Sequence, residues 1–149
     1  MKDLVNAGVN IVALEKNEHK YGMTCAWAMQ VDEDQLLLLL GSQSETANII
    51  EEGDIIGVSA LCIGQEAIAT KFGTKHSSKT NKFYDVKYEN EEGAILIRKA
   101  SKKMKCRVVK IGHIYDNDED YLVQVRVLSM ESDNDSFLSM TEYRKSVEK

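Results

Sequence analysis

Three hydroxyl side chains, Ser42, Ser44 and Thr46, follow directly on a run of five leucines at residues 36–40. The leucine run has the length of a strand that is buried on both faces. The residues after it, SQSETANIIEEGD, have the pattern of a short helix, with Ser44 as the N-cap and an acidic residue at the positive end of the helix dipole. Free N–H groups at such a turn bind anions, and hydroxyl groups add donors. The pattern therefore predicts an anion site here, and Ser44 can cap the helix at the same time.

The segment KYGMTCAWAMQV, residues 20–31, holds the only tryptophan of the chain, Trp27, among small and polar neighbours. We predict one β-strand for this segment, although apolar and polar residues do not alternate along it as they do on a strand with one face in solvent. Small side chains allow a backbone to approach a flat ligand closely. Trp27 is therefore either a core aromatic residue or part of a wall beside such a ligand.

Two basic stretches contain no acidic residue. The loop TKHSSKTNKF, residues 74–83, combines three lysines with hydroxyl and amide side chains. Such a loop can clamp an anion, although a solvated loop is the commoner result for this composition. The stretch 98–110 has seven basic residues in thirteen, and several of them alternate with apolar residues. We interpret it as a strand with one face in solvent rather than as a stripe that binds nucleic acid.

Familiar catalytic and metal-binding motifs are missing from the sequence. The acidic run Asp116–Asp120 lacks the glycine and glutamate of a calcium loop, whose places hold Tyr121 and Val127, so we interpret it as a solvated hairpin turn. The three histidines have no paired spacing to one another or to the cysteines, which argues against a zinc site. No GxGxxG, GxxxxGK[ST] or GxSxG sequence occurs. We predict neither a metal site nor a catalytic side chain.

Length and composition are those of one globular domain. A chain of 149 residues is long enough to bury its own core. Its formal charge of −5 argues against nucleic acid as the main partner. Three cysteines without CxxC spacing predict reduced thiols. Because no secretion signal and no apolar run of membrane-spanning length are visible, we expect a cytoplasmic protein without a membrane partner.

Strands outnumber helices in the predicted order of elements. Strands are expected at residues 7–15, 20–31, 35–41, 55–61, 83–89, 94–100, 104–111 and 121–130. Short helices are expected within residues 42–54 and 64–72, closed by Gly53 and Gly73. Short turns join most strands, which favours a β-barrel with small helical excursions over a parallel βαβ sheet. From Ser132 the sequence is polar, and we expect a mobile tail.

Three blocks of the sequence resemble the flavin reductase-like family, which includes the flavoredoxins. They are GMTCAWAMQV, LLLLLGSQSETANIIEEGDIIGVSAL and IATKFGTKHSSKTNKF, and the similarity runs in order from about residue 7 to residue 130. The resemblance implies a mainly β fold, an FMN-binding split β-barrel that is Greek-key-like and has short peripheral helices. It also implies a homodimer with FMN as cofactor, and NADH or NADPH as the substrate that reduces it.

The resemblance assigns the two ends of the flavin to two of the predicted elements. The strand that matches MTCAW lines the isoalloxazine ring, where backbone N–H groups would stabilise charge on reduced flavin. The turn rich in serine and threonine binds the phosphate, and the lysine of TNKF reaches the flavin. The implied cofactor-binding residues are Met23, Thr24, Cys25, Ala26, Trp27, Ser42, Gln43, Ser44, Thr46 and Lys82.

Two departures from the family pattern bear on function. A family histidine that approaches the nicotinamide corresponds to Asp120, and an asparagine at the head of the ring-binding strand corresponds to Tyr21. Two function classes therefore stay open. The chain is either an NAD(P)H-dependent FMN reductase, as the family habit implies, or a non-catalytic FMN-binding electron carrier between redox partner proteins, which Asp120 favours. A barrel that has lost flavin and serves as an interaction module is a third interpretation.

Overall fold

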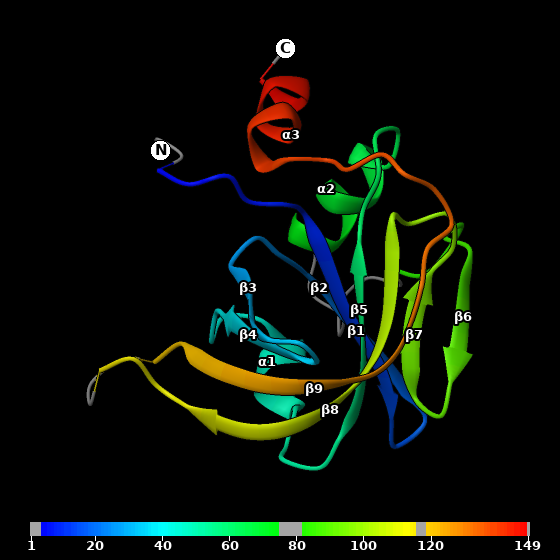
Figure 1. The fold of residues 1–149 in the computed structure, drawn as a ribbon. Helices are drawn as coiled ribbons and strands as arrows, with labels where there is room; N and C mark the ends of the chain where they lie inside the picture. Colours follow the sequence, from blue (N-terminus) through cyan, green and yellow to red (C-terminus); the bar gives the residue numbers. More distant parts are fainter. Residues whose placement is uncertain (1–3, 75–81, 116–118, 149) are drawn as a thin grey trace.

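The computed structural model describes residues 4–74, 82–115 and 119–148 (Figure 1). Within these residues, nine strands form one antiparallel sheet that curls round without closing, and three helices lie at its periphery. The strands are β1 (Asn10–Lys16), β2 (His19–Cys25), β3 (Ala28–Asp32), β4 (Gln35–Leu40), β5 (Ile55–Ala60), β6 (Tyr88–Glu91), β7 (Ala94–Ile97), β8 (Lys102–Gly112) and β9 (Tyr121–Glu131). The helices are α1 (Glu45–Ile49), α2 (Glu66–Thr74) and α3 (Met140–Val147). The predicted fold class, a split β-barrel with short helices, is confirmed.

Strand β1 joins the parts of the barrel. The strand order is β3-β4-β9-β8-β5-β1-β7-β6, and β2 pairs with β1 outside this path. Along one edge β1 pairs with β2 over its whole length, and along the other edge it pairs first with β5 and then with β7. The long hairpin of β8 and β9 continues the sheet from β5 to β4. As a result, β2 keeps one edge that no strand of the described residues covers.

Two apolar clusters form the core. One fills the barrel, with Leu38 and Leu40 of the leucine run fully buried in it. The other lies between the barrel and α2, where the rings of Phe72 and Phe83 pack edge to face with centroids 5.0 Å apart. The leucine run was expected to be buried on both faces, but only its even-numbered face points into the barrel. Leu37 and Leu39 are half-buried on the outside of the barrel.

The segment 20–31 forms two strands rather than the one strand that we predicted. β2 ends at Cys25 and β3 begins at Ala28. In the bend between them, the N–H of Ala28 donates to the carbonyl of Ala26 at 3.1 Å, and the carbonyl of Trp27 accepts from Leu39 N–H at 2.9 Å. These bonds carry the chain from its pairing with β1 to its pairing with β4.

The missing alternation in this segment has two causes: β2 is covered on both faces from Tyr21 to Cys25, and β3 is exposed throughout. Tyr21, Met23 and Cys25 face the cluster inside the barrel. On the opposite face, a Cβ atom added at Gly22 would lie 2.6 Å from the ring of Phe72, so the strand packs tightly against the second cluster. A strand without a solvent-exposed face shows no period of two in its polarity.

Other element boundaries also differ from the sequence prediction. The strand expected at residues 83–89 is shorter, because residues 83–86 form turns and β6 begins at Tyr88. Gly53 does not close the first helix, which ends with Ile50 in an extended conformation. Gly53 instead has a φ of 94° in the turn before β5. The second helix runs through Gly73 to Thr74.

The polar segment after β9 is attached to the barrel at several points, and Leu138 is its most deeply buried side chain. Leu138 is fully buried in the second cluster, and its N–H donates to the carbonyl of Leu61 at 3.0 Å. Its carbonyl accepts from Val9 N–H at 3.1 Å, and α3 follows. The sequence predicts only a polar, mobile tail here, because a single leucine gives no periodic signal. Within the described residues no helix has the length and apolarity needed to span a membrane.

Candidate functional site

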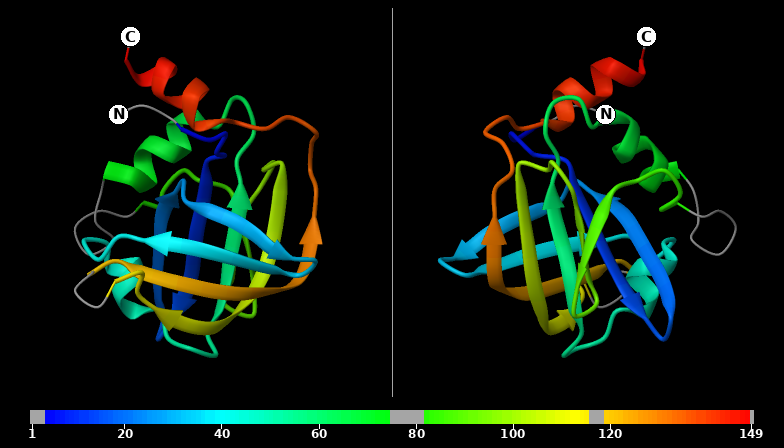
Figure 2. Two further views of the ribbon diagram at one scale, coloured as in Figure 1. Left: turned by 60° about the vertical axis from the view of Figure 1, so that its left-hand side comes forward. Right: turned by 90° about the vertical axis from the view of Figure 1, so that its right-hand side faces the viewer.

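The unpaired edge of β2 lies between two helices. Both α1 and α2 pack against β2, and Figure 2 shows the two helices on the same side of the barrel. An uncovered strand edge presents N–H and C=O groups that can bond to another strand or to a ligand. This edge is therefore the place in the fold where a ligand can meet the backbone of β2.

Lys82 lies on this edge and is only 4% exposed. Its Nζ donates to the carbonyl oxygens of Gly22 at 2.9 Å and of Phe72 at 3.3 Å. Burial lowers the pKa of Lys82, and the carboxylate of Glu45, the first residue of α1, partly offsets this effect. Among the described residues, the hydrogen bonds of this buried ammonium go to carbonyl groups, and burying a charge in this way is costly, so an anionic group near the edge would stabilise it.

The side chains of Met23–Trp27 do not share one surface. Met23 and Cys25 point into the barrel, and burial raises the pKa of the Cys25 thiol to about 12. Thr24 Oγ1 donates to a backbone carbonyl of α2 at 2.7 Å. Trp27 is 57% exposed, so the interpretation of Trp27 as a core aromatic residue is wrong. A ligand at this strand would meet the backbone and the indole of Trp27 rather than Met23 or Cys25.

The turn at Ser42–Thr46 is built as the sequence predicts, with Ser44 as the N-cap. Ser44 Oγ accepts from the N–H of Thr46 at 3.2 Å, and α1 has five residues. Thr46 is fully buried, and its Oγ1 has no hydrogen-bond partner among the described residues. Leaving a buried hydroxyl unpaired costs about 1–3 kcal/mol. The side of the turn nearest the core therefore contains a hydroxyl group that forms no hydrogen bond with any described residue.

The end of the β8–β9 hairpin is tied to this turn by side chains. The N–H of Ser42 donates to Asp120 Oδ1 at 3.1 Å, and His113 Nδ1 lies 2.9 Å from the carbonyl of Asp120. Tyr121 OH donates to Asn48 Oδ1 at 2.8 Å, while Asn48 Nδ2 donates to the carbonyl of Ser42. The sequence does not predict the contact between Asp120 and Ser42, because the two residues are 78 positions apart and no local pattern links them.

The structure gathers the predicted residues into one region. Met23–Trp27 lie on β2 and the bend after it, and Ser42–Thr46 lie on the turn into α1. Lys82 connects these two parts, because it donates a hydrogen bond to the carbonyl of Gly22 on β2 and interacts electrostatically with Glu45 of α1. Their assignment to a ligand stays a prediction. Lys75 and Lys79 of the basic loop, and residues 116–118 of the acidic run, lie outside the described residues. Among the described residues, no three His, Cys, Asp or Glu side chains are grouped so that they could hold a metal ion.

Comparison with known families identifies the domain. The profile of the family described as "Flavin reductase like domain" matches residues 1–147. The chain belongs to the flavin reductase-like family. The resemblance seen in the three sequence blocks is thus confirmed. A comparison of this flavin reductase-like chain with curated proteins finds no match.

Solved structures of other proteins have the same fold. Flavoredoxin from Methanosarcina acetivorans superposes with a TM-score of 0.75 at 16% identity, covering 89% of this chain and 73% of that one. The NADH:FAD oxidoreductase of Streptomyces globisporus C-1027 gives 0.74 at 21% identity, with coverage of 86% and 76%. An FMN-binding protein from Thermus thermophilus gives 0.74 at 11% identity, with coverage of 87% and 72%. At these identities the similarity establishes the shared fold.

Proposed function

We propose that this flavin reductase-like chain binds FMN, with the flavin ring against the free edge of β2. The observation that carries the proposal is this edge, which no described strand covers and which has a buried lysine on it and an exposed tryptophan at its end. Membership of the family supports a flavin ligand. The names of two structural neighbours, an FMN-binding protein and an NADH:FAD oxidoreductase, also support it.

The phosphate end of FMN would lie at the turn into α1. Ser42, Gln43 and Ser44 are on the surface of this turn, and the unpartnered hydroxyl of Thr46 lies beneath it. The positive charge of Lys82 would offset the charge of the phosphate. The residues of the turn thus fit the ligand, because they offer donors and a polar atom that lacks a bond.

As the reaction we propose the reduction of flavin by NADH or NADPH. When bound, flavin would supply the redox chemistry, as acceptor of a hydride from the nicotinamide and as donor of electrons to the next acceptor. The part of the chain is to bind and orient. The backbone from Met23 to Ala26 would hold one edge of the ring, Lys82 would stabilise negative charge, and the indole of Trp27 would shield one side of the ring from water. No side chain needs to transfer a proton.

The second candidate function is electron transfer between redox partner proteins without nicotinamide turnover. Asp120 favours it, because a carboxylate stands where the family pattern has a histidine. An ionised carboxylate only accepts hydrogen bonds, and it would repel the phosphates of the dinucleotide.

We further propose a homodimer through the outer face of β3, β4 and β9. This outer face is defined by Trp27, Met29, Leu37, Leu39 and Leu122, which the strand register places on one side of the sheet. Trp27 and Met29 are 57% and 61% exposed. An apolar surface of this kind on a small protein is typical of an interaction site. Its position next to β2 would put the flavin near the interface.

We also propose that the protein works in the cytoplasm. Its three cysteines are free and buried, as expected for thiols in a reducing compartment.

The only tryptophan of the chain gives a direct test of flavin binding. Titration with FMN should quench the emission of Trp27 saturably, because the indole would lie against the ring. Steady-state oxidation of NADH and NADPH with added FMN then separates the two candidate functions. A purified protein without flavin absorbance, whose tryptophan emission FMN does not change saturably, would contradict flavin binding itself.

Two aromatic variants make the test specific to the site. Trp27→Ala should weaken FMN binding, measured by flavin fluorescence, at least about fivefold, or ~1 kcal/mol. Phe137→Ala is the matched control, because Phe137 is 55% exposed and lies in the segment after β9, where it contacts Lys102. Equal loss in both variants would show that Trp27 is not at the flavin.

A further inference from the structure

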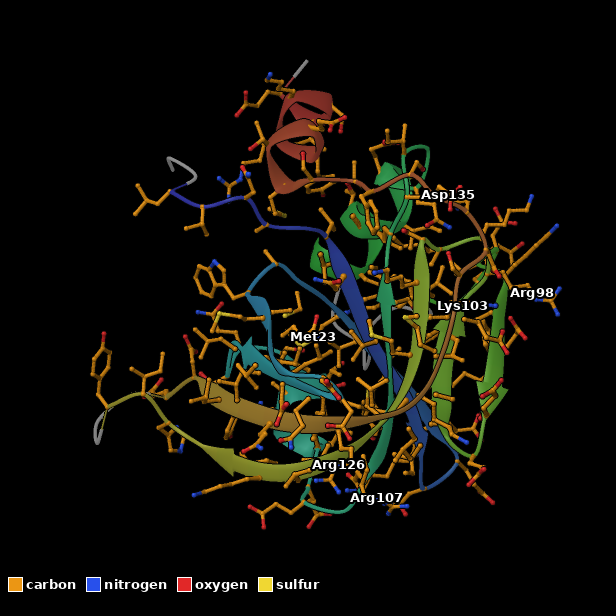
Figure 3. All side chains as sticks on the ribbon, in the orientation of Figure 1. Met23, Arg98, Lys103, Arg107, Arg126 and Asp135 are labelled. Carbon is orange, nitrogen blue, oxygen red and sulfur yellow. The ribbon has the colours of Figure 1, made fainter. Side chains whose placement is uncertain are left out.

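A cleft lies on the β6–β7 side of the barrel. Its volume is about 600 Å³, which is within the range of small-molecule sites. Residues of α2, of the turn before β6, of the end of β7 and of the start of β8 line it. Figure 3 shows Arg98 and Lys103 at this side of the molecule, well apart from Met23 on β2. The cleft is therefore separate from the candidate flavin site.

The inner wall of the cleft is fixed by Lys103, which is 4% exposed. Its Nζ lies 2.6 Å from Glu89, 3.1 Å from Asp133 and 3.6 Å from Glu131. This lysine thus engages the carboxylates of Glu89 and Asp133, two of the three acids that line the cleft. The third acid is Asp85.

The rim of the cleft carries three cations that these acids do not pair with. Lys87, Arg98 and Lys99 all line the cleft, and within the described part of the chain none of them has a carboxylate within ion-pair distance. Arg98 contributes to the lowered pKa of Asp133, but the hydrogen bond from Lys103 is the largest cause of that shift. The rim is left with three cations against the single carboxylate of Asp85.

Two of the rim cations lie directly opposite each other. The pairing of Tyr88 with Ile97 continues by one step, because the N–H of Arg98 donates to the carbonyl of Lys87 at 3.1 Å. Residues opposite each other in an antiparallel pair have side chains on the same face, and like charges at such positions repel. An anion between them would turn this repulsion into attraction.

The backbone on either side of this pair is strained. Asp85 and Lys99 have φ values of 64° and 66°, in the left-handed region that residues with a side chain rarely occupy. Lys99 is held there by its N–H, which donates to Asp133 Oδ2 at 2.9 Å. Three further residues with such φ values, Asn17, Glu18 and Glu92, lie in hairpin turns, so these conformations are those of tight turns; the two turns at Asp85 and Lys99 fix the backbone that lines the cleft.

We propose that this cleft binds a small organic anion, a phosphate monoester or a carboxylate with an apolar body. The guanidinium of Arg98 can bind either oxyanion through two parallel hydrogen bonds, and Lys87 adds a point charge beside it. Ile68 and Val86 line the cleft and provide contact for the apolar body. The site does not depend on flavin binding.

Phenyl phosphate is the probe that combines both features. Added to the 15N-labelled protein at millimolar concentration, it should shift the amide signals of Ile68, Val86 and Lys99 saturably. Inorganic phosphate, which lacks the apolar body, should bind more weakly. Benzoate tests whether a carboxylate on the same apolar ring binds in place of the phosphate. Phenol has the ring but no charge under these conditions, and it should not bind. Saturable shifts at these amides with phenyl phosphate or with benzoate support the site and identify the preferred oxyanion.

Matched variants separate the site from general attraction between charges. Arg98→Gln should weaken the binding of phenyl phosphate at least about tenfold. Lys110→Gln removes a cation of β8 that, like Arg98, is exposed but does not line the cleft, and it should leave binding unchanged. Thermal unfolding of each variant checks its fold. The proposal is overturned if none of the three anions shifts the cleft amides saturably. It is also overturned if both variants lose binding alike, or if the shifts centre on Trp27 and residues 42–46 instead.

Discussion

The carboxylate of Asp120 accepts a hydrogen bond from the N–H of Ser42. It therefore places a negative charge at the turn that we propose as the binding site of the flavin phosphate. The chain thus supplies its own anion to a backbone donor that a phosphate would otherwise use. FMN must either displace this carboxylate or bind beside it, and in both cases repulsion lowers the affinity. Riboflavin has no phosphate and would not experience this repulsion.

A single substitution tests this competition at the residue scale. Asp120→Asn keeps an oxygen that can accept from Ser42 N–H but removes the charge. It should raise FMN affinity about fivefold, or ~1 kcal/mol, because two charges a few ångströms apart in a watery site repel by about that amount. Riboflavin affinity should stay the same. Both are measured by titration of flavin fluorescence.

Glu119→Gln is the control for this experiment, because it removes an exposed charge from the neighbouring position. If Glu119→Gln raises FMN affinity as much as Asp120→Asn does, the effect comes from the net charge of the protein and not from the position of Asp120. If neither variant changes the ratio of FMN to riboflavin affinity, the phosphate lies elsewhere.

At the scale of elements, the barrel depends on a close crossing of β5 and β7. A Cβ atom built at Gly57 would lie 2.0 Å from the carbonyl oxygen of Ile95, a distance that no side chain can occupy. Gly57→Ala should therefore force the two backbones apart and lower the free energy of unfolding by more than about 3 kcal/mol, measured by urea denaturation. Gly112→Ala is the matched control on β8, since nothing lies within 4 Å of its added Cβ. It should change stability by less than about 0.5 kcal/mol.

The ion pairs of Lys103 connect β8 to β6 and to the segment after β9. Burial by itself would lower the pKa of Lys103, but hydrogen bonds with Glu89 and Asp133 outweigh this and hold the pKa above the ordinary 10.5. The folded state thus binds this proton more tightly than the unfolded state. The stability that the ion pairs contribute is complete below pH 10.5 and is lost as the pH rises through the raised pKa.

Lys103→Met should consequently lower the free energy of unfolding near neutral pH by about 1–3 kcal/mol. The gap between the variant and the unmodified protein should stay constant from neutral pH to about pH 10, and it should narrow only as the pH rises above 10.5 toward the raised pKa of Lys103. Lys105→Met, which removes the more exposed pair with Glu92, should cost less than about 1 kcal/mol. A gap for Lys103→Met that does not change over this pH range would show that lost packing, and not charge, causes the effect.

At the scale of the whole molecule, the outer face of β3, β4 and β9 determines the assembly that we propose. Met29→Lys places a charge at the most exposed apolar position of this face, which would have to be desolvated in a dimer. The mass measured by light scattering should fall from that of a dimer of 16.8 kDa chains to that of a monomer. Ile63→Lys, at an exposed position before α2, should remain dimeric. If the unmodified protein is monomeric at every concentration, the dimer proposal fails.

The sequence by itself determined features that depend on neighbouring residues. The strand made by the leucine run, the N-cap at Ser44 and the short helix after it all follow from spacing within a few positions, and the structure has each of them. Enough of these local features occur in the right order for the mainly β fold and the family to be predicted. A barrel with short turns follows from them, because each strand needs a partner close in sequence or across the sheet.

Only the tertiary structure decided which distant groups meet. The bend at Ala26 and Trp27 depends on a hydrogen bond from Leu39, and the exposure of Trp27 depends on that bend. Asp120 reaches Ser42, and Lys103 reaches Glu89 and Asp133, through a register that pairs strands far apart in the chain. Local composition does not predict such contacts, because a lysine or an aspartate with the same neighbours in sequence also occurs on strands that face solvent. Burial and pairing are properties of the folded sheet. They bury Lys103 among carboxylates, and they leave Lys87 and Arg98 without an ion-pair partner in the described part of the chain.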